Sequence, residues 1–174
     1  MNIKELLTHI TTFIFDYDGV LTDGTIIIDR EGELLRTANV RDGYAIRQAV
    51  RKGYRVAIIS GGKTESVRKR FEVLGVHDVF LGVGNKLEVY EAYLKEHHLG
   101  DEEVLFMGDD IPDFELMRRS GVATCPADAS EEIKAVAMMI SSLPGGKGCV
   151  RDVIEQVMRV QNKWFDETAY SWDV

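Results

Sequence analysis

Short apolar runs alternate with longer amphipathic segments along most of the chain. Five of these runs are bounded by glycine or polar residues, as buried strands are, and they cover 11–17, 55–60, 79–81, 104–107 and 122–124. Helical patterns lie between and after them, at about 44–51, 64–74, 86–98, 113–119 and 150–160. Because strands that alternate with helices are typical of a sheet covered on both faces, we predict a doubly wound, mostly parallel, Rossmann-like α/β fold.

One segment interrupts this alternation. Residues 24–40 (GTIIIDREGELLRTANV) contain two extended apolar runs on either side of a polar turn. Gly32 can adopt the positive φ that a tight turn requires, so we predict a β-hairpin inserted after the first strand. Three consecutive isoleucines, Ile26 to Ile28, place apolar side chains on both faces of the hairpin. An isolated hairpin is marginal in water, so these side chains need either a neighbouring subunit or the domain itself as a partner.

Length and composition limit the function classes. The 174 residues fit one domain, 1–174, and the net charge of −8 argues against nucleic-acid or anionic-membrane partners. No segment approaches the roughly 18 apolar residues of a membrane span, and the first ten residues lack a signal-peptide core. Cys125 and Cys149 have no CxxC spacing. We therefore expect a cytoplasmic protein without a cysteine metal site.

Polar clusters follow four of the predicted strands. Asp16 and Asp18 come after the first, Ser60-Gly61-Gly62 after the second, Lys86 after the third, and Asp109, Asp110 and Asp113 after the fourth. Ligands bind beyond the carboxyl ends of strands in an open parallel sheet, so these groups are expected to share one rim. Each cluster alone has an ordinary structural explanation, as a turn, a loop, a surface lysine or a helix cap.

Taken together, the clusters indicate phosphoryl chemistry. Carboxylates that converge on one rim repel one another, and a hard divalent cation with oxygen ligands resolves the conflict. We therefore predict bound Mg²⁺. Ser60, the amides of the glycine loop at Gly61, and Lys86 can hold the oxygens of a phosphoryl group. Asp18 lies two residues beyond Asp16, on the same side of an extended chain, so both can reach one reacting centre.

The ordered motifs DYDGVLTDG, ISGG, Lys86 and GDDIPD resemble the four motifs of the haloacid dehalogenase superfamily, over essentially the whole chain. This resemblance implies that Asp16 is the nucleophile that forms an aspartyl-phosphate and that Asp18 is the general acid and base. It also implies that Ser60 and Lys86 bind phosphate. Mg²⁺ would be held by Asp16, Asp109 and the main-chain carbonyl of Asp18, with Asp110 and Asp113 in support.

The gaps between motifs leave no room for a cap domain. This capless pattern, with VLTDG, a hairpin, RDG at 41–43 and GGKGCVRD, is similar to the 3-deoxy-D-manno-octulosonate 8-phosphate phosphatase family. The resemblance implies a phosphorylated 2-keto sugar acid as substrate, a role in lipopolysaccharide biosynthesis, and a homotetramer in which neighbouring subunits replace the cap. A 9-phosphate phosphatase of sialic-acid-type nonulosonates is the alternative.

The substrate-binding side chains are less well defined by the sequence. Many members of the family carry a charged side chain at the position of Gly62, and the resemblance implies that this position helps to select the sugar acid. Candidates to meet a substrate carboxylate are Lys63, Arg68, Lys147 and Arg151. The loop 145–148 could cradle phosphate or be a turn before the last helix. The aromatic tail, 162–174, could pack on its own domain or on a neighbour.

Two other classes of function use similar residues. A signalling receiver domain also has a phosphorylated aspartate, an acidic cluster, a hydroxyl and a lysine, but its acceptor follows the third strand, whereas Asp16 follows the first. A non-catalytic module with this fold would be expected to have lost a motif residue, and none is lost here. A screen of sugar phosphates for phosphate release separates these classes.

Overall fold

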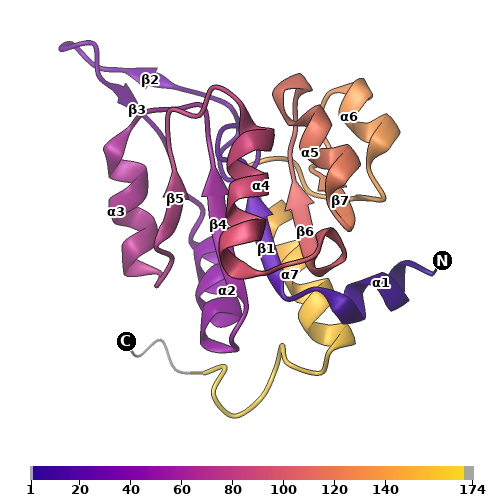
Figure 1. The fold of residues 1–174 in the computed structure, drawn as a ribbon. Coiled ribbons are helices and arrows are strands. Elements are labelled where there is room, and N and C mark those ends of the chain that lie inside the picture. The colour runs from indigo at the N-terminus through magenta and orange to yellow at the C-terminus, as the bar shows by residue number, and fades with distance from the viewer. Residues whose placement is uncertain (1, 171–174) are drawn as a thin grey trace.

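The computed structural model describes residues 2–170 and contains a six-stranded sheet whose strands are all parallel (Figure 1). The strand order is β5-β4-β1-β6-β7-β8. The strands are β1 (Thr12–Phe15), β4 (Arg55–Ile59), β5 (Asp78–Phe80), β6 (Val104–Met107), β7 (Val122–Cys125) and β8 (Met139–Ile140). The chain builds one half of the sheet outward from β1 and then crosses back to β6, so the order reverses at the central strand. The predicted doubly wound fold is confirmed.

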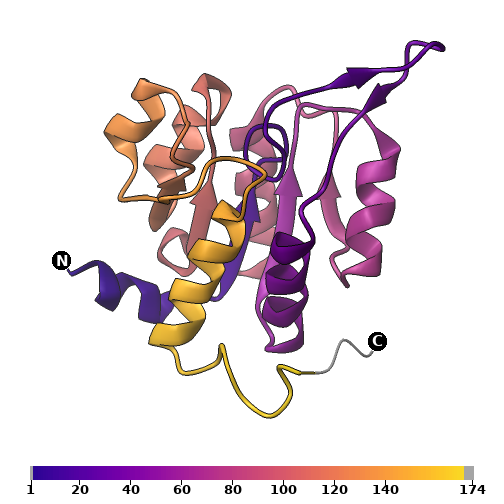
Figure 2. The ribbon, with the colours of Figure 1, turned by 180° about the vertical axis from the view of Figure 1, so that it is seen from behind.

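Helices cover both faces of this sheet. They are α1 (Ile3–His9), α2 (Val40–Arg51), α3 (Glu65–Val73), α4 (Lys86–His97), α5 (Phe114–Arg119), α6 (Glu131–Val136) and α7 (Cys149–Val160), with 3₁₀ turns at η1 (Asp101–Glu103) and η2 (Ile111–Asp113). Helices α2 and α7 lie together on the face that is at the back in Figure 1 and at the front in Figure 2. Helices α4, α5 and α6 pack on the opposite face. No helix among residues 2–170 is long and apolar enough to cross a membrane.

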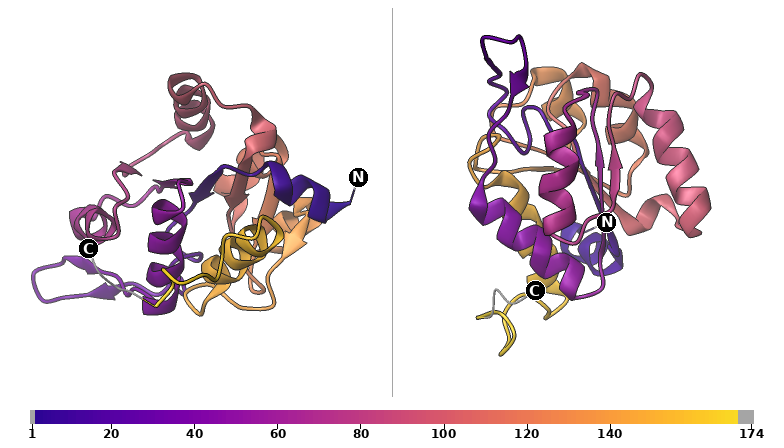
Figure 3. Two further views of the ribbon diagram at one scale, coloured as in Figure 1. Left: turned by 90° about the horizontal axis from the view of Figure 1, so that it is seen from below. Right: turned by 90° about the vertical axis from the view of Figure 1, so that its left-hand side faces the viewer.

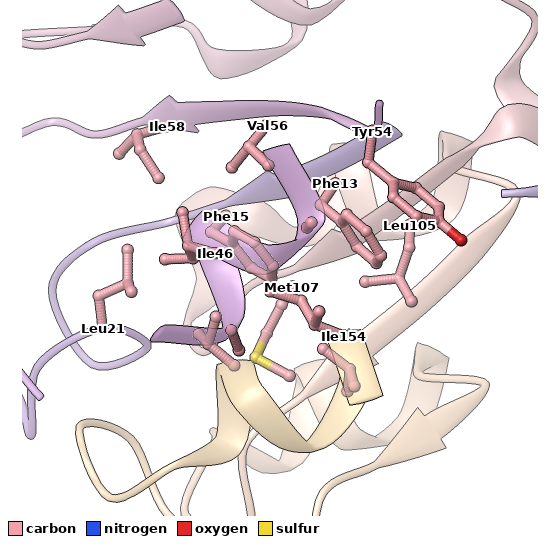
Figure 4. Packing of buried hydrophobic residues seen from close by; sticks show 14 of the residues in the cluster. Phe13, Phe15, Leu21, Ile46, Tyr54, Val56, Ile58, Leu105, Met107 and Ile154 are labelled. Atoms are coloured by element: carbon pink, nitrogen blue, oxygen red, sulfur yellow. The ribbon is translucent and has the colours of Figure 1, made fainter. Parts of the chain in front are cut away.

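Alternate residues of the central strands build two separate cores. On β1, Phe13 and Phe15 face the core with α2 and α7, whereas Ile14 faces the core with α4 and α5. All three side chains are fully buried. Figure 4 shows the first core, where Met107 of β6 lies between β1 and Ile154 of α7. Because both faces of β1 are buried, the strand is a rigid support for the residues that follow it.

The predicted hairpin is present, with β2 (Ile27–Ile28) antiparallel to β3 (Leu34–Leu35). Gly32 has φ +82° in its turn, as expected for a position that requires glycine. The hairpin projects from the end of the sheet at which the strand arrows point (Figures 1 and 3). Its apolar side chains are exposed, Ile27 at 54% and Ile28 at 68%. The hairpin therefore does not fold back to bury them on its own domain.

Some elements differ from the prediction. The structure adds α1, α6 and β8, and α2 begins at Val40 rather than near residue 44. The side chain of Asn39 accepts hydrogen bonds from the amides of Arg41 and Asp42, which starts the helix before Gly43. The short β8 forms by pairing with β7 in the folded chain, so the local sequence alone does not reveal it.

The first part of the aromatic tail packs on its own domain. Trp164 is buried and meets the ring of Tyr44 edge to face at 6.1 Å, and the hydroxyl of Tyr44 donates to the carbonyl of Ala169 over 2.6 Å. This segment lies at the end of the molecule opposite the hairpin (Figures 1 and 3). Residues 171–174 of the predicted tail lie outside the described residues.

Candidate active site

The carboxyl ends of β1, β4 and β6 form the floor of a cavity of about 820 Å³. The cavity contains the residues that the sequence predicted to share one rim. Its lining includes Asp16, Asp18, Ser60, Gly61, Gly62, Lys86, Asp109, Asp110 and Asp113. Four motifs that are far apart in the chain therefore meet in one place, as the order of the strands predicted.

Asp16 and Lys86 form the buried centre of the cavity. The amide of Asp16 donates to the carbonyl of Met107, which continues the ladder between β1 and β6 by one residue. Nζ of Lys86 lies 2.8 Å from Oδ1 of Asp16 and 2.6 Å from Oδ1 of Asp113. Lys86 is only 8% exposed. A solvated surface role for this lysine is thus excluded.

The start of α4 orients Lys86. The side chain of Asn85 accepts hydrogen bonds from the amides of Leu87 and Glu88, as predicted for a helix cap. Lys86 is therefore in the first turn, where the helix dipole opposes a cation. Two buried carboxylates compensate for that position. Burial alone would lower the pKa of Lys86, but Asp16 and Asp113 raise it, so the side chain stays charged.

Three carboxylates lie close enough to bind one cation. One oxygen each of Asp16, Asp109 and Asp113 lies within 4.8 Å of the others. Burial and the neighbouring Asp113 raise the pKa of Asp16 to about 6. Burial and the charges of Asp16 and Asp113 raise the pKa of Asp109 to about 8. This repulsion among hard oxygen ligands fits a divalent cation such as Mg²⁺.

Asp113 already has partners for both oxygens. Oδ1 pairs with Lys86, and Oδ2 accepts a hydrogen bond from the amide of Asp109 over 3.1 Å. Within residues 2–170, the carboxylate of Asp109 accepts no hydrogen bond from a backbone amide or a lysine, and its Oδ2 lies against Gly19. The geometry thus suits Asp16 and Asp109 as metal ligands and Asp113 as the group that orients them.

Glycines bring the loops of the cavity into close contact. Gly19 has φ +85°, and a Cβ there would lie 1.9 Å from Oδ2 of Asp109. A Cβ at Gly145 would lie 1.9 Å from the carbonyl oxygen of Gly19. The amide of Gly146 also donates to the carbonyl of Val20. The 145–148 loop therefore supports the loop after β1, and it is absent from the lining of the cavity.

Ser60 and Asp110 both line the cavity. The hydroxyl of Ser60 accepts a hydrogen bond from the amide of Gly62 over 3.1 Å, which shapes the glycine loop. The exposed Asp110 accepts from the amide of Ile111 and caps η2. Ser60 follows β4 and Asp110 follows β6, and these strands lie on opposite sides of β1.

The four cations suggested for a substrate carboxylate do not line the cavity. Arg68 pairs with Glu65 and donates to the carbonyl of Val79. Arg151 pairs with Glu155 and lies over the rings of Tyr44 and Trp164. Lys147 is exposed, and the chain of Lys63 packs beside Gly82.

Sequence reasoning missed a different cation. Nε and Nη2 of Arg36 donate to the two carboxylate oxygens of Asp18, over 2.7 and 3.0 Å. Arg36 follows the second hairpin strand, 18 residues beyond its partner. The one sequence feature that bears on this contact is the length of the hairpin segment, which is sufficient to bring Arg36 back to the first motif.

The chain is similar to known phosphatases over most of its length. The pattern of the haloacid dehalogenase-like hydrolases matches residues 76–148. The 3-deoxy-D-manno-octulosonate 8-phosphate phosphatase of Escherichia coli K12 is 37% identical over 155 residues, which are 89% of this chain and 82% of that protein. The enzyme of that name from Yersinia pestis is 34% identical over 98% of this chain and 91% of its own length.

Solved structures give the same result. The phosphatase of that name from Moraxella catarrhalis, in complex with a magnesium ion, a phosphate ion and a KDO molecule, superposes with a TM-score of 0.89 at 31% identity and covers 92% of each chain. The Yersinia pestis enzyme superposes with a TM-score of 0.90 at 33% identity, over 92% of this chain and 87% of that one.

Proposed function

Since this chain belongs to the 3-deoxy-D-manno-octulosonate 8-phosphate phosphatase family of haloacid dehalogenase-like hydrolases, we propose that it hydrolyses that sugar-acid phosphate through an aspartyl-phosphate on Asp16. The observation that carries the proposal is the contact of Lys86 with Asp16 inside the carboxylate cavity. A buried lysine 2.8 Å from a carboxylate can hold a phosphoryl oxygen beside the nucleophile. The Moraxella catarrhalis relative, with KDO and phosphate bound, supports the substrate.

Two steps account for the reaction. In the first, a carboxylate oxygen of Asp16 attacks phosphorus, the bond from phosphorus to the sugar oxygen breaks, and Asp18 gives its proton to that oxygen. In the second, water attacks the phosphorus of the aspartyl-phosphate and Asp18 accepts a proton of the water. Inorganic phosphate leaves, and Asp16 is a carboxylate again. Lys86, Ser60 and the amides at Gly61 hold the phosphoryl oxygens in both steps.

Mg²⁺ would be held by the carboxylates of Asp16 and Asp109 and the main-chain carbonyl of Asp18. When bound, it neutralises charge on the phosphoryl group. Asp113 keeps Lys86 and the amide of Asp109 in place, and Asp110 caps the turn that follows. Gly19 lets the loop after β1 approach Asp109 as closely as a shared ligand requires.

The active enzyme is proposed to be a cytoplasmic homotetramer. The exposed Ile27, Ile28 and Leu35 of the hairpin support this state, because a neighbouring hairpin could bury them. Light scattering is expected to give about four times the chain mass of 19.6 kDa. A fully active monomer would contradict the assembly without affecting the chemistry at Asp16.

A substrate panel tests the activity. Phosphate release is measured for the octulosonate 8-phosphate, a nonulosonate 9-phosphate, glucose 6-phosphate and a nucleotide, each with Mg²⁺ and with excess chelator. We expect the 8-phosphate to have the highest kcat/KM and chelation to stop all turnover. A higher value for the 9-phosphate would assign the enzyme to nonulosonates. Equal values for glucose 6-phosphate and the sugar acids would refute the substrate class, and no release from any compound would favour a non-catalytic or receiver-like module.

A further inference from the structure

A buried arginine of the hairpin arm holds the carboxylate of Asp18. Only 5% of the Arg36 side chain is exposed. Its Nε and Nη2 donate to the two oxygens of Asp18, and Nη1 donates to the hydroxyl of Thr64 and, over 3.5 Å, to the carbonyl of Leu34. Each nitrogen of the guanidinium has a partner, and both oxygens of Asp18 are bonded to the hairpin arm.

Gly62 makes room for this arrangement. A Cβ at Gly62 would lie 3.0 Å from Nη2 of Arg36 and 3.4 Å from Oδ2 of Asp18. Nη2 and Oδ2 are the donor and acceptor of one hydrogen bond. A larger side chain at position 62 would therefore press on the ion pair itself. Gly62 lines the cavity, and the guanidinium therefore lies directly behind the cavity wall.

This ion pair conflicts with the work of a general acid. Asp18 must turn a carboxyl oxygen toward the leaving oxygen, whereas Nε and Nη2 of Arg36 hold both of its oxygens. Arg36 must therefore release Asp18 before the ester bond breaks. Separating this pair is unfavourable when the guanidinium, whose side chain is only 5% exposed, is left without a partner.

We propose that Arg36 holds Asp18 away from the leaving oxygen until the carboxylate of the substrate replaces Asp18 on the guanidinium. We call this contact the latch. A guanidinium binds one carboxylate in the same bidentate manner as another, so a sugar acid can take the place of Asp18. The cavity extends from Asp16 past Asp18 to Gly24 and Gly62, which leaves room for the sugar beyond the phosphate. A neutral sugar phosphate offers Arg36 no replacement and leaves Asp18 held.

The inference rests on the proposed function and adds a specificity-determining residue to it. It couples recognition at one end of the substrate to proton transfer at the other. Carboxylate-bearing substrates are then favoured in the bond-breaking step as well as in binding. No covalent bond is made or broken by the exchange, because one ion pair replaces another.

Three substrates separate the parts of this mechanism. The octulosonate 8-phosphate has a carboxylate and a leaving group that needs a proton. Ribose 5-phosphate needs the proton but has no carboxylate. p-Nitrophenyl phosphate has a leaving group that departs as an anion, so its kcat/KM reports the attack of Asp16 without proton transfer from Asp18. Steady-state kinetics are measured with Mg²⁺ for the wild type, Arg36→Gln, Arg36→Lys and the control Arg119→Gln, whose exposed ion pairs are with Glu91 and Asp101.

We expect Arg36→Gln to lower kcat/KM for the sugar-acid phosphate by about 10- to 100-fold. In the same variant, kcat/KM for ribose 5-phosphate should stay equal or rise, because Asp18 is no longer held, and kcat/KM for p-nitrophenyl phosphate should not change. The control Arg119→Gln should leave kcat/KM unchanged for all three substrates. Arg36→Lys keeps the positive charge but loses the planar group that donates two parallel hydrogen bonds. Its kcat/KM for the sugar-acid phosphate should therefore lie between those of the wild type and Arg36→Gln. Equal losses on the sugar-acid phosphate and ribose 5-phosphate, or no loss on either, would overturn the latch.

A binding measurement adds a readout that does not depend on turnover. In the inert Asp16→Asn background, calorimetry should show that Arg36→Gln weakens the sugar-acid phosphate at least tenfold and leaves ribose 5-phosphate unchanged. If thermal unfolding shows that Arg36→Gln does not fold, Arg36→Lys alone tests the latch. An unchanged ratio of kcat/KM between the sugar-acid phosphate and ribose 5-phosphate in Arg36→Lys then refutes it. A wild type that does not prefer the sugar acid refutes the proposed function, whereas a preference that persists in both variants refutes only the latch.

Discussion

The carboxylate cluster is expected to make the metal-free protein less stable as the pH rises. The pKa of Asp109 is raised from 3.8 to about 8 by burial and by Asp16 and Asp113, and that of Asp16 is raised to about 6. Because these folded-state values lie above the unfolded values, the folded chain binds more protons, and the free energy of unfolding falls as the pH rises from about 4 to 8. Replacing Asp109 by Asn removes the largest of these penalties.

The size of the effect follows from the two pKa values of Asp109. Their difference corresponds to about 6 kcal/mol if it is fully expressed. Asp109 is half-buried, and solvent screening reduces that figure. We therefore expect Asp109→Asn to raise the free energy of unfolding of the metal-free protein by about 1–3 kcal/mol at pH 7.5, and by much less at pH 5.

Urea unfolding in chelator, with and without excess Mg²⁺, measures this. Mg²⁺ at 100 times its dissociation constant should stabilise the wild type by about 2.7 kcal/mol and Asp109→Asn by far less. Asp110→Asn is the comparison variant: its amide can keep the cap on Ile111, and because its charge raises the pKa of Asp109 less than burial, Asp16 and Asp113 do, it should stabilise the metal-free protein less than Asp109→Asn. If Asp109→Asn is no more stable than the wild type at pH 7.5 without metal, the repulsion that we assign to the cluster is absent.

Three further perturbations test the site. Gly19→Ala should lower kcat/KM by at least about 100-fold, because its Cβ would displace Asp109, whereas Gly53→Ala, at the same φ of +85° with no atom within 4 Å, should cost only about 1 kcal/mol of stability. Lys86→Met should abolish turnover and weaken phosphate binding in calorimetry; normal phosphate affinity would exclude Lys86 as a ligand. Ca²⁺ in place of Mg²⁺ should inhibit, since it accepts looser coordination and both oxygens of Asp16; full activity with Ca²⁺ would contradict that reason.

The sequence predicted the parts of the fold that depend on local pattern. The strands β1, β4 and β6 are apolar on both faces, so their positions were evident within one or two residues. The site residues at the ends of these strands followed from the sheet topology. The helix α6 and the strand β8 were missed, because each is short and is stabilised by contacts distant in sequence.

Side-chain partners were harder to predict than positions. Arg151 was a candidate for the substrate, yet the tail brings Trp164 against it, together with Tyr44. Arg36 was not considered, although it contacts Asp18 directly. Both outcomes depend on where the tail and the residue that follows β3 contact the domain, and such contacts leave no local signal in the sequence.

Trapping the phosphorylated enzyme tests the central claim most directly. Asp18→Asn should still be phosphorylated by p-nitrophenyl phosphate, whose leaving group needs no proton, but should lose about 10²–10⁴ in the hydrolysis of the intermediate. After rapid quenching, borohydride reduces an aspartyl-phosphate to homoserine, and mass spectrometry of the peptide locates it. We predict homoserine at position 16 and none at 109 or 113. An unmodified Asp16, or modification at another aspartate, would contradict the proposed mechanism.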